Sequence, residues 1–324
     1  MSLLETRRLK KYFSLQNAIL PRNRATVKAV DGVDLSIKQG ETLGLVGESC
    51  CGKSTFGRLC LRLLDPSGGE VYFGGEDISH CQAEQMRQLR RKMQIIFQDP
   101  YSALNPRMKV LDAIKAPLDA FGEGSRKDRK EQVAQIMERV GLRQDQIYRF
   151  PHEFSGGQRQ RIVIARALVL KPSFVVCDEP VSALDVSVRS QVINLMRKLQ
   201  RDFSLTYLFI SHDLSLIKHV SDRVAVMYLG RIVELAAKDE LFKHTLHPYT
   251  QALMSAIPIP DAEVKPQPIL LKGETPSPIS LPPGCRFSAR CPQQTGICVE
   301  EEPVLRDMGG GHFAACHLCT AGVL

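Results

Sequence analysis

The sequence has no long apolar run and no N-terminal signal pattern. No stretch in its 324 residues approaches the ~18 apolar residues that a membrane-spanning helix needs. The first residues, Met1 to Arg7, lack the charged-then-apolar order of a secretory signal peptide. We therefore expect the chain to be made and kept in the cytoplasm.

Other absences exclude further classes of protein. The 23 glycines and 19 prolines are too few for a fibrous or disordered chain, and no repeat occurs at solenoid spacing. No unbroken basic run is long, although the net charge is +8. This charge indicates either a solvated basic surface or an anionic partner, such as a nucleotide, a nucleic acid or lipid headgroups. The hydrophobic content of 44% is sufficient for one main core and a smaller second unit.

A glycine-bracketed loop is the strongest chemical signal. It reads G-E-S-C-C-G-K-S-T and fits the phosphate-loop pattern G-x-x-x-x-G-K-[ST], with a strand expected before it and a helix after it. Its two glycines let successive N–H groups turn toward phosphate oxygens, and Lys53 adds a positive charge. The Ser54 hydroxyl suits Mg²⁺, which prefers oxygen ligands. The residues predicted to contact nucleotide are Gly47, Ser49, Cys50, Cys51, Gly52, Lys53, Ser54 and Thr55. A glycine turn before an ordinary helix is the alternative interpretation.

Two acidic residues end the apolar run that starts at Phe174. Neighbouring residues that leave a strand point in different directions, so Asp178 and Glu179 can do different work. We expect Asp178 to hold Mg²⁺ through water and Glu179 to activate the attacking water, a role whose loss costs ~10²–10⁴-fold in rate. A carboxylate pair in a surface turn is the alternative, which the phosphate loop disfavours.

Two more polar residues follow apolar strands. Gln98 comes after the run that begins at Met93, and its amide oxygen is a candidate for the Mg²⁺ shell. His212 follows the run from Thr206 to Ile210 and is a candidate contact for the γ-phosphate. A lone histidine is more often structural, but its position at the end of a core strand favours the functional interpretation.

A second glycine-rich helix start lies about a hundred residues after the phosphate loop. Its residues are Ser155, Gly156, Gly157 and Gln158. Such a helix start offers N–H groups and the helix dipole to an anion. Because the chain has only one lysine-bearing loop, we expect this second start to serve a nucleotide that another subunit holds. A plain serine-capped helix is the alternative.

The order of strands and helices predicts an α/β fold with a mainly parallel sheet. Residues 69–77 are expected to form a small hairpin, and a helical subdomain is expected over about 99–170. The composition changes after about Ser255, where frequent prolines predict an extended, loop-like segment because proline fixes φ. The predicted domains are therefore an ATPase domain at 1–255 and a proline-rich linker with a cysteine-rich extension at 256–324. The expected strands are Asp31–Lys38, Thr42–Val46, Met93–Phe97, Phe174–Cys177, Thr206–Ile210 and Arg223–Tyr228, with helices at Gly52–Leu64 and Val186–Arg201.

Together these motifs resemble the nucleotide-binding subunit of ABC transporters over residues 1–255. The resemblance implies a P-loop NTPase fold with an antiparallel β subdomain and a helical subdomain. It implies a Walker A motif at residues 47–55, a Q-loop at Gln98 and a signature motif at residues 155–158. It also implies a Walker B motif at residues 174–179, a D-loop at residues 182–185 and a switch at His212. It also implies that an aromatic residue near the N-terminus stacks on adenine, and Phe13 fits that register better than Tyr12. Two positions depart from the family pattern: Cys50 replaces a usual glycine, and Phe154 replaces a common leucine.

The C-terminal part is similar to the oligopeptide/dipeptide/nickel importer group, and within it to the ATPase subunits of dipeptide permeases. The motifs that carry this likeness are H-P-Y-T-Q-A-L at 247–253, G-E-T-P-S-P at 273–278 and P-P-G-C at 282–285. The resemblance implies a second ATPase subunit, identical or homologous, that binds head to tail. It implies two transmembrane permease subunits, an extracellular peptide-binding protein and a location at the cytoplasmic face of the membrane, with no nucleic acid as partner.

Five of the ten cysteines lie between Cys285 and Cys319. Such clustering indicates a local metal or cluster site more than a disulfide framework. Zinc sites usually need close cysteine pairs, and only Cys316 and Cys319 form one. Four thiolates can instead hold a [4Fe–4S] cluster. The resemblance implies such a cluster, with the ligands Cys285, Cys291, Cys298 and Cys316; zinc and reduced thiols remain the alternatives. Either metal would staple the C-terminal extension.

The expected function is ATP hydrolysis that energises uptake of di- or oligopeptides across the cytoplasmic membrane, with ATP, Mg²⁺ and the cluster as cofactors. One alternative keeps the same motor but transports nickel or another small solute. An alternative of another class is a soluble ABC ATPase that acts on nucleic acid. A regulatory subunit without hydrolysis is disfavoured because Glu179 and His212 are both present.

Overall fold

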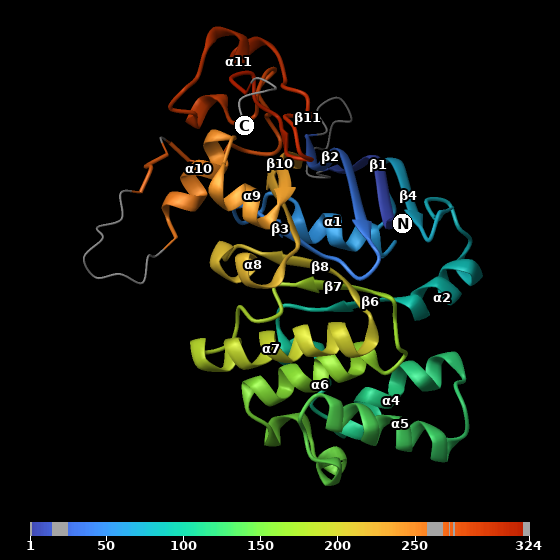
Figure 1. Cartoon of the computed structure of the whole chain (residues 1–324). Helices are drawn as coiled ribbons and strands as arrows, with labels where there is room; N and C mark the ends of the chain where they lie inside the picture. The colour runs from blue at the N-terminus through green and yellow to red at the C-terminus, as the bar shows by residue number, and fades with distance from the viewer. Residues whose placement is uncertain (1, 15–24, 258–267, 272, 275, 320–324) are drawn as a thin grey trace. The chain divides into compact units, whose positions relative to one another are not determined.

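The computed structural model describes residues 2–14, 25–257, 268–271, 273–274 and 276–319, in two compact units (Figure 1). The phosphate-loop unit comprises residues 2–37, 42–80 and 210–319, and the helical unit comprises residues 38–41 and 81–209. Among the described residues, no helix combines the length and the apolar character that crossing a bilayer requires. Three prolines of the predicted linker, Pro258, Pro260 and Pro266, lie outside the described residues.

A four-stranded sheet in the phosphate-loop unit forms the antiparallel subdomain. Its strand order is β2-β1-β4-β5, and β4 is antiparallel to both β1 and β5. The hairpin expected at 69–77 is therefore confirmed. The strands are β1 (Ser2–Ser14), β2 (Thr26–Lys38), β4 (Gly68–Phe73) and β5 (Glu76–Asp77).

The second sheet of this unit carries the phosphate loop. The strands of this sheet that belong to the phosphate-loop unit lie in the order β11-β12-β10-β9-β3; β3 is parallel to β9, and the other neighbours are antiparallel. The C-terminal extension thus adds two short strands to the sheet. The strands are β3 (Thr42–Val46), β9 (Arg223–Tyr228), β10 (Arg231–Ala237), β11 (Arg306–Asp307) and β12 (Phe313–Ala314). The helices are α1 (Lys53–Cys60), α8 (Leu214–Val220), α9 (Lys238–Lys243), α10 (Pro248–Ser255), η3 (Ser288–Arg290) and α11 (Gly296–Glu300).

The helical unit combines short buried strands with a helical region. Strand β6 is parallel to β7, and the strand order is β8-β7-β6. Helices α4, α5 and α6 pack on one another through buried apolar side chains such as Ile114, Val133 and Ile162. The strands are β6 (Met93–Ile96), β7 (Phe174–Asp178) and β8 (Thr206–Ser211), whose last two residues belong to the phosphate-loop unit. The helices are α2 (Ala83–Lys92), α3 (Pro100–Ala103), α4 (Val110–Phe121), α5 (Arg126–Arg139), η1 (Gln144–Tyr148), η2 (Pro151–Glu153), α6 (Gly156–Leu168) and α7 (Val186–Phe203).

The helix after the phosphate loop is shorter than the sequence predicts. The sequence predicts a helix that reaches Leu64, but α1 ends at Cys60. Arg62 adopts a left-handed backbone with φ +50°, and the Leu63 N–H donates to the Arg58 carbonyl at 2.9 Å. This pattern closes a helix C-terminus, so the apolar periodicity beyond Cys60 belongs to a turn.

Candidate functional site

The phosphate loop connects β3 to α1, as its sequence predicts. Every residue of β3 is buried, so the loop starts from a fixed position. A Cβ at Gly47 would lie 2.2 Å from the Met227 carbonyl oxygen, and one at Gly52 would lie 2.1 Å from the Ala29 oxygen. Both loop glycines therefore lie directly against backbone, and no other residue fits at these positions.

The loop's own carbonyl groups hold Lys53. Its ammonium group donates to the carbonyl oxygens of Gly47 and Glu48, each at 2.7 Å, and the side chain is only 5% exposed. This arrangement folds the lysine over the loop and keeps its charge there. Ser54 and Thr55, both half-buried, follow in the first turn of α1.

Two neighbouring cysteines lie inside the loop in different environments. Cys50 is exposed and has φ +62°, a left-handed conformation that a side chain with a Cβ adopts only at a cost. Cys51 is buried, and its sulfur lies 3.7 Å from Lys53 Nζ. Burial raises the pKa of the Cys51 thiol, so it stays protonated. The Cys50 position is therefore one where the usual glycine of the family pattern would be less strained.

In the helical unit the structure brings Gln98 and Glu179 together. Gln98 Nε2 donates to Glu179 Oε2 at 3.0 Å. Asp178 ends strand β7 and is 6% exposed, whereas Glu179 is half-buried. Glu179 has φ +48°, a strained conformation of the kind that clusters at functional sites. The Ser182 hydroxyl donates to the Glu179 carbonyl at 3.1 Å and fixes the turn that follows.

The glycine-rich segment after Phe154 starts α6, as predicted. Ser155 Oγ accepts from the Gln158 N–H at 3.3 Å, and Gln158 Oε1 accepts from the Ser155 N–H at 3.0 Å. This reciprocal pair is a capping box. A Cβ at Gly157 would lie 2.3 Å from a Val188 methyl carbon, so only glycine lets α6 approach α7 here. Gly156 and Ser155 remain accessible at the helix tip.

The remaining predicted nucleotide contacts belong to the phosphate-loop unit. His212 is exposed just after β8, and the Asp213 carboxylate caps α8 by accepting from the Leu216 N–H at 3.1 Å. Phe13 is 38% exposed near the end of β1. The neighbouring Tyr12 is half-buried and its hydroxyl bonds to Asp31, which leaves Phe13 as the more accessible ring.

The four predicted cluster cysteines all lie in the C-terminal extension. Burial raises the pKa of the Cys285 thiol to about 11, and the nearby thiols of Cys298, Cys316 and Cys291 add to this rise. A hydrogen bond with the Cys319 thiol lowers the pKa of Cys316 to about 6. Within the described part of the chain, however, no group of three or more His, Cys, Asp or Glu side chains is arranged to hold a metal ion.

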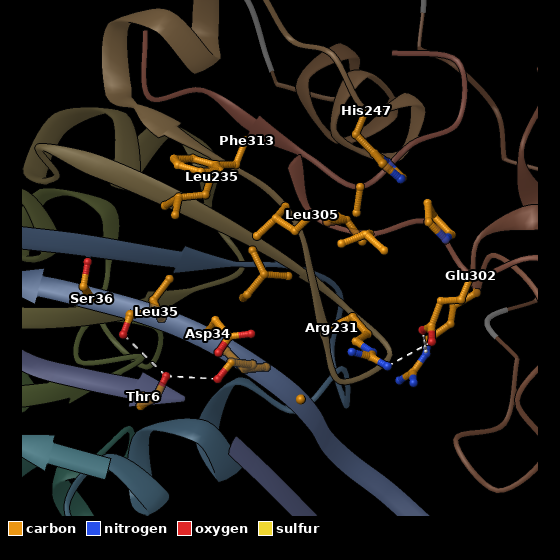
Figure 2. A pocket seen from close by; sticks show the side chains of 18 of the residues that line it. Thr6, Asp34, Leu35, Ser36, Arg231, Leu235, His247, Glu302, Leu305 and Phe313 are labelled. Atoms are coloured by element: carbon orange, nitrogen blue, oxygen red, sulfur yellow. Dashed lines mark hydrogen bonds and ion pairs between the residues drawn. The ribbon is translucent and has the colours of Figure 1, made fainter. Parts of the chain in front are cut away.

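One cavity of the phosphate-loop unit lies away from the phosphate loop. It has a volume of about 770 Å³ and is lined by strands β1, β2 and β10 and by the extension. Figure 2 shows Thr6, Asp34 and Leu35 on one side and Glu302 on the other, where Glu302 pairs with Arg231 at 2.9 Å. No residue from 47 to 55 lines this cavity. The cavity is therefore not part of the phosphate loop.

Three residues contact the predicted motifs although the sequence did not indicate them as site residues. The Tyr249 hydroxyl accepts from the Glu48 N–H, and Arg290 pairs with the Glu48 carboxylate. Arg159 donates to the Pro151 carbonyl at 2.8 Å and the Phe154 carbonyl at 3.0 Å, just before the signature-like segment. Tyr249 stands in the H-P-Y motif and Arg159 follows Gln158, but nothing near Arg290 in the sequence indicates its contact.

Comparison with known proteins agrees with this arrangement. The ABC transporter family matches residues 30–182, and the oligopeptide/dipeptide transporter C-terminal region matches residues 233–298. The chain is 52% identical to the oligopeptide transport ATP-binding protein AppF of Bacillus subtilis, covering 98% of this chain and 97% of that protein. It is 48% identical to the dipeptide transport ATP-binding protein DppF of Escherichia coli, covering 97% and 93% of the two chains.

Solved structures show the same fold. The dimeric post-hydrolysis state of the ATP-binding cassette MJ0796, bound to ADP and Pi, has a TM-score of 0.64 and 25% identity, covering 72% of this chain and 98% of that one. The cbiO1 subunit from Clostridium perfringens also has a TM-score of 0.64 and 25% identity, covering 75% and 91%. The chain therefore belongs to the family of ABC transporter ATP-binding subunits, in the group that carries the oligopeptide/dipeptide transporter C-terminal region.

Proposed function

We propose that this chain is the ATP-hydrolysing subunit of an importer for di- or oligopeptides. Sequence identity of 48–52%, over nearly the full length, to ATP-binding proteins of oligopeptide and dipeptide transport is the observation that carries this proposal. The hydrogen bond between Gln98 and Glu179 supports an active ATPase, because it links a candidate cation ligand to the candidate base. The permease subunits determine which solute is transported.

The residues of this chain divide the work of phosphoryl transfer. Lys53 and the loop amides bind the phosphates, and Phe13 stacks on adenine. Glu179 accepts a proton from the attacking water, Gln98 orients Glu179 through its amide nitrogen, and His212 contacts the γ-phosphate. Such catalysis consists mainly of positioning and electrostatic stabilisation of an in-line displacement.

The oxygen donors of the chain suit Mg²⁺. Ser54, Gln98 and Asp178 provide a hydroxyl, an amide oxygen and a carboxylate, which are the ligand types that this cation prefers. Because the amide nitrogen of Gln98 is the atom bonded to Glu179, its oxygen is the atom that can bind a cation. When bound, Mg²⁺ neutralises the charge of the β- and γ-phosphates.

A second ATPase subunit completes the site in this proposal. The tip of α6 keeps Ser155 exposed, and its capping box uses the N–H groups of Ser155 and Gln158. The N–H groups of the two glycines between them are the ones that would donate to a bound anion. This tip would contact the nucleotide held by the partner subunit, and the partner's equivalent tip would contact the nucleotide on this chain. Two transmembrane permeases and an extracellular peptide-binding protein complete the importer, which places this chain at the cytoplasmic face of the membrane.

The extension is proposed to hold a [4Fe–4S] cluster through Cys285, Cys291, Cys298 and Cys316, with Zn²⁺ as the alternative metal. Thiolates are suitable ligands for either metal, and the thiols of Cys298, Cys316 and Cys291 all help to raise the pKa of the Cys285 thiol. Such a group would cross-link the extension and so stabilise its fold, and it takes no part in ATP hydrolysis. Iron and zinc analysis of anaerobically purified protein, together with absorbance near 400 nm, tests it; colourless, zinc-loaded protein would support the alternative.

Reconstitution tests the function. The chain is purified with its co-expressed permeases, placed in liposomes with the peptide-binding protein, and assayed for ATP-dependent uptake of labelled dipeptide. Uptake that disappears in Lys53→Ala supports the proposal. Uptake of nickel instead of peptide would support the same motor with another solute, and ATP hydrolysis stimulated by nucleic acid in the absence of permeases would support the soluble alternative.

A further inference from the structure

The first non-glycine residue of the phosphate loop is tied to the C-terminal part of the chain at two points. The Glu48 N–H donates to the Tyr249 hydroxyl at 2.8 Å, and the Glu48 carboxylate lies 2.8 Å from Arg290 Nη1. Tyr249 belongs to α10, and Arg290 is the last residue of η3 in the extension. Residues 201 and 242 positions further along the chain therefore hold the same loop residue.

Both contacts are protected from solvent. Tyr249 is fully buried, and burial raises the pKa of its phenol far above the ordinary value, so the hydroxyl keeps its proton. The side chains of Arg290 and Glu48 are 10% and 24% exposed. A hydrogen bond between charged groups that are largely shielded from water is stronger than one on the surface.

An aromatic cluster supports the two contacts. The ring of Tyr228, at the end of β9, lies 4.6 Å from the ring of Tyr249 and 5.3 Å from the ring of Phe287. The third pair, Tyr249 and Phe287, lies 5.4 Å apart, and all three side chains are at most 1% exposed. Because Gly47 lies directly against the carbonyl of Met227, the residue before Tyr228, this cluster continues the surface on which the phosphate loop begins.

From these contacts we propose that Tyr249 and Arg290 are positioning residues for the phosphate loop, and that the C-terminal region thereby sets the affinity of the chain for ATP. The proposal rests on the ATP-binding function proposed above. Tyr249 fixes the N–H of Glu48 and Arg290 fixes its side chain. The carbonyl groups of Gly47 and Glu48, which hold Lys53, then keep one orientation, and the amides that follow stay directed toward phosphate.

Fluorescent ATP binding to the purified full-length chain tests the proposal. Tyr249→Phe removes only the hydroxyl, and Arg290→Gln removes the charge. Each is expected to raise the Kd for ATP by roughly three- to tenfold, the effect of losing one hydrogen bond. Arg290→Lys keeps a positive charge and should restore part of the affinity.

A matched control separates this role from a general effect on folding. Tyr207 is a buried tyrosine of β8 whose hydroxyl donates to the Met196 carbonyl at 3.3 Å, within the helical unit. Tyr207→Phe should leave the Kd unchanged, whatever it does to the melting temperature. If Tyr249→Phe does not fold, the Arg290 variants decide alone.

The outcomes distinguish the two proposals. If the wild-type chain does not bind ATP, or if Lys53→Ala binds it equally well, the proposed function fails. If the wild-type chain binds ATP and both Tyr249→Phe and Arg290→Gln bind it as tightly, the positioning role is wrong while the function stands. A rise in Kd of the same size in Tyr207→Phe would likewise contradict the positioning role.

Discussion

His312 of the extension and Glu234 of β10 form a fully buried hydrogen bond, with 2.8 Å between Nε2 and Oε1. The same carboxylate accepts from the Leu246 N–H at 2.8 Å and the His247 N–H at 3.1 Å. Glu234 thus joins three segments of the phosphate-loop unit. Because Glu234 is fully buried, each of these bonds is expensive to lose.

Removing His312 should loosen the extension. We expect His312→Ala to lower the free energy of unfolding by about 1–3 kcal/mol, because the buried Glu234 carboxylate loses one of its three hydrogen bonds. Hydrogen exchange at residues 313–319 should become faster. The control is His244→Ala, which removes an exposed partner of Glu240, and pairs of that kind contribute little. Equal exchange rates in His312→Ala and the wild-type chain would contradict the account of Glu234.

Acid should destabilise the unit through His247. Burial lowers the pKa of His247 to about 4, against 6.5 for an unperturbed histidine. Between pH 6.5 and 4 the unfolded chain therefore binds more protons than the folded chain, so stability is complete above about pH 6.5 and falls as the pH is lowered. For this group alone, the loss at pH 4.5 is about 2–3 kcal/mol.

An asparagine at position 247 provides the control for this pH effect. The His247 ring accepts from the Tyr249 N–H at 3.1 Å at the start of α10, and asparagine is a good residue at such a position that does not titrate. Denaturant unfolding at pH 7 and pH 4.5 should give a smaller difference for His247→Asn than for the wild-type chain. A difference of equal size would assign the acid sensitivity to other groups.

Much of the site could be predicted because its signals are local. The phosphate loop, the carboxylates at the end of β7 and the capped start of α6 each lie within ten residues, and their patterns follow from backbone requirements. The contacts of Glu48 with Tyr249 and Arg290 could not be predicted, because they join residues about 200 and 240 positions apart. Likewise, the short strands β11 and β12 have no apolar alternation of their own, since pairing with β10 creates them.

Arg159 should matter for turnover more than for nucleotide binding. Its guanidinium donates to the Pro151 and Phe154 carbonyls and stacks over the Tyr101 ring, 4.4 Å from the centroid. Tyr101 belongs to α3, which begins two residues after Gln98, so this contact connects two predicted motifs of the helical unit.

The kinetics of variants at these two positions test this connection. We expect Arg159→Ala to lower the kcat of the assembled transporter by about tenfold with little change in Kd for ATP, and Tyr101→Leu to lower it less, in line with ~0.5–1 kcal/mol for such a contact. Tyr101→Phe keeps the ring and should behave like the wild-type chain. The connection is refuted if Arg159→Ala changes only the affinity for ATP.

Cys50→Gly should stabilise the phosphate loop. Glycine adopts φ +62° without the cost that cysteine has there, so we expect a gain of up to about 1 kcal/mol in the free energy of unfolding. The exposed thiol also disappears, so ATPase activity should become less sensitive to hydrogen peroxide. Unchanged stability, ATPase rate and peroxide sensitivity in Cys50→Gly would show that the cysteine is neutral.

The most direct measurement of the central claim uses Glu179→Gln. If Glu179 activates water, this variant should hydrolyse ATP ~10²–10⁴-fold more slowly while still binding it. In the presence of ATP and Mg²⁺ it should then accumulate as a closed assembly of two ATPase subunits, detectable by light scattering. ADP should not produce this assembly. Normal turnover by Glu179→Gln, without any ATP-dependent assembly, would contradict the claim that this chain is an ATP-driven motor subunit.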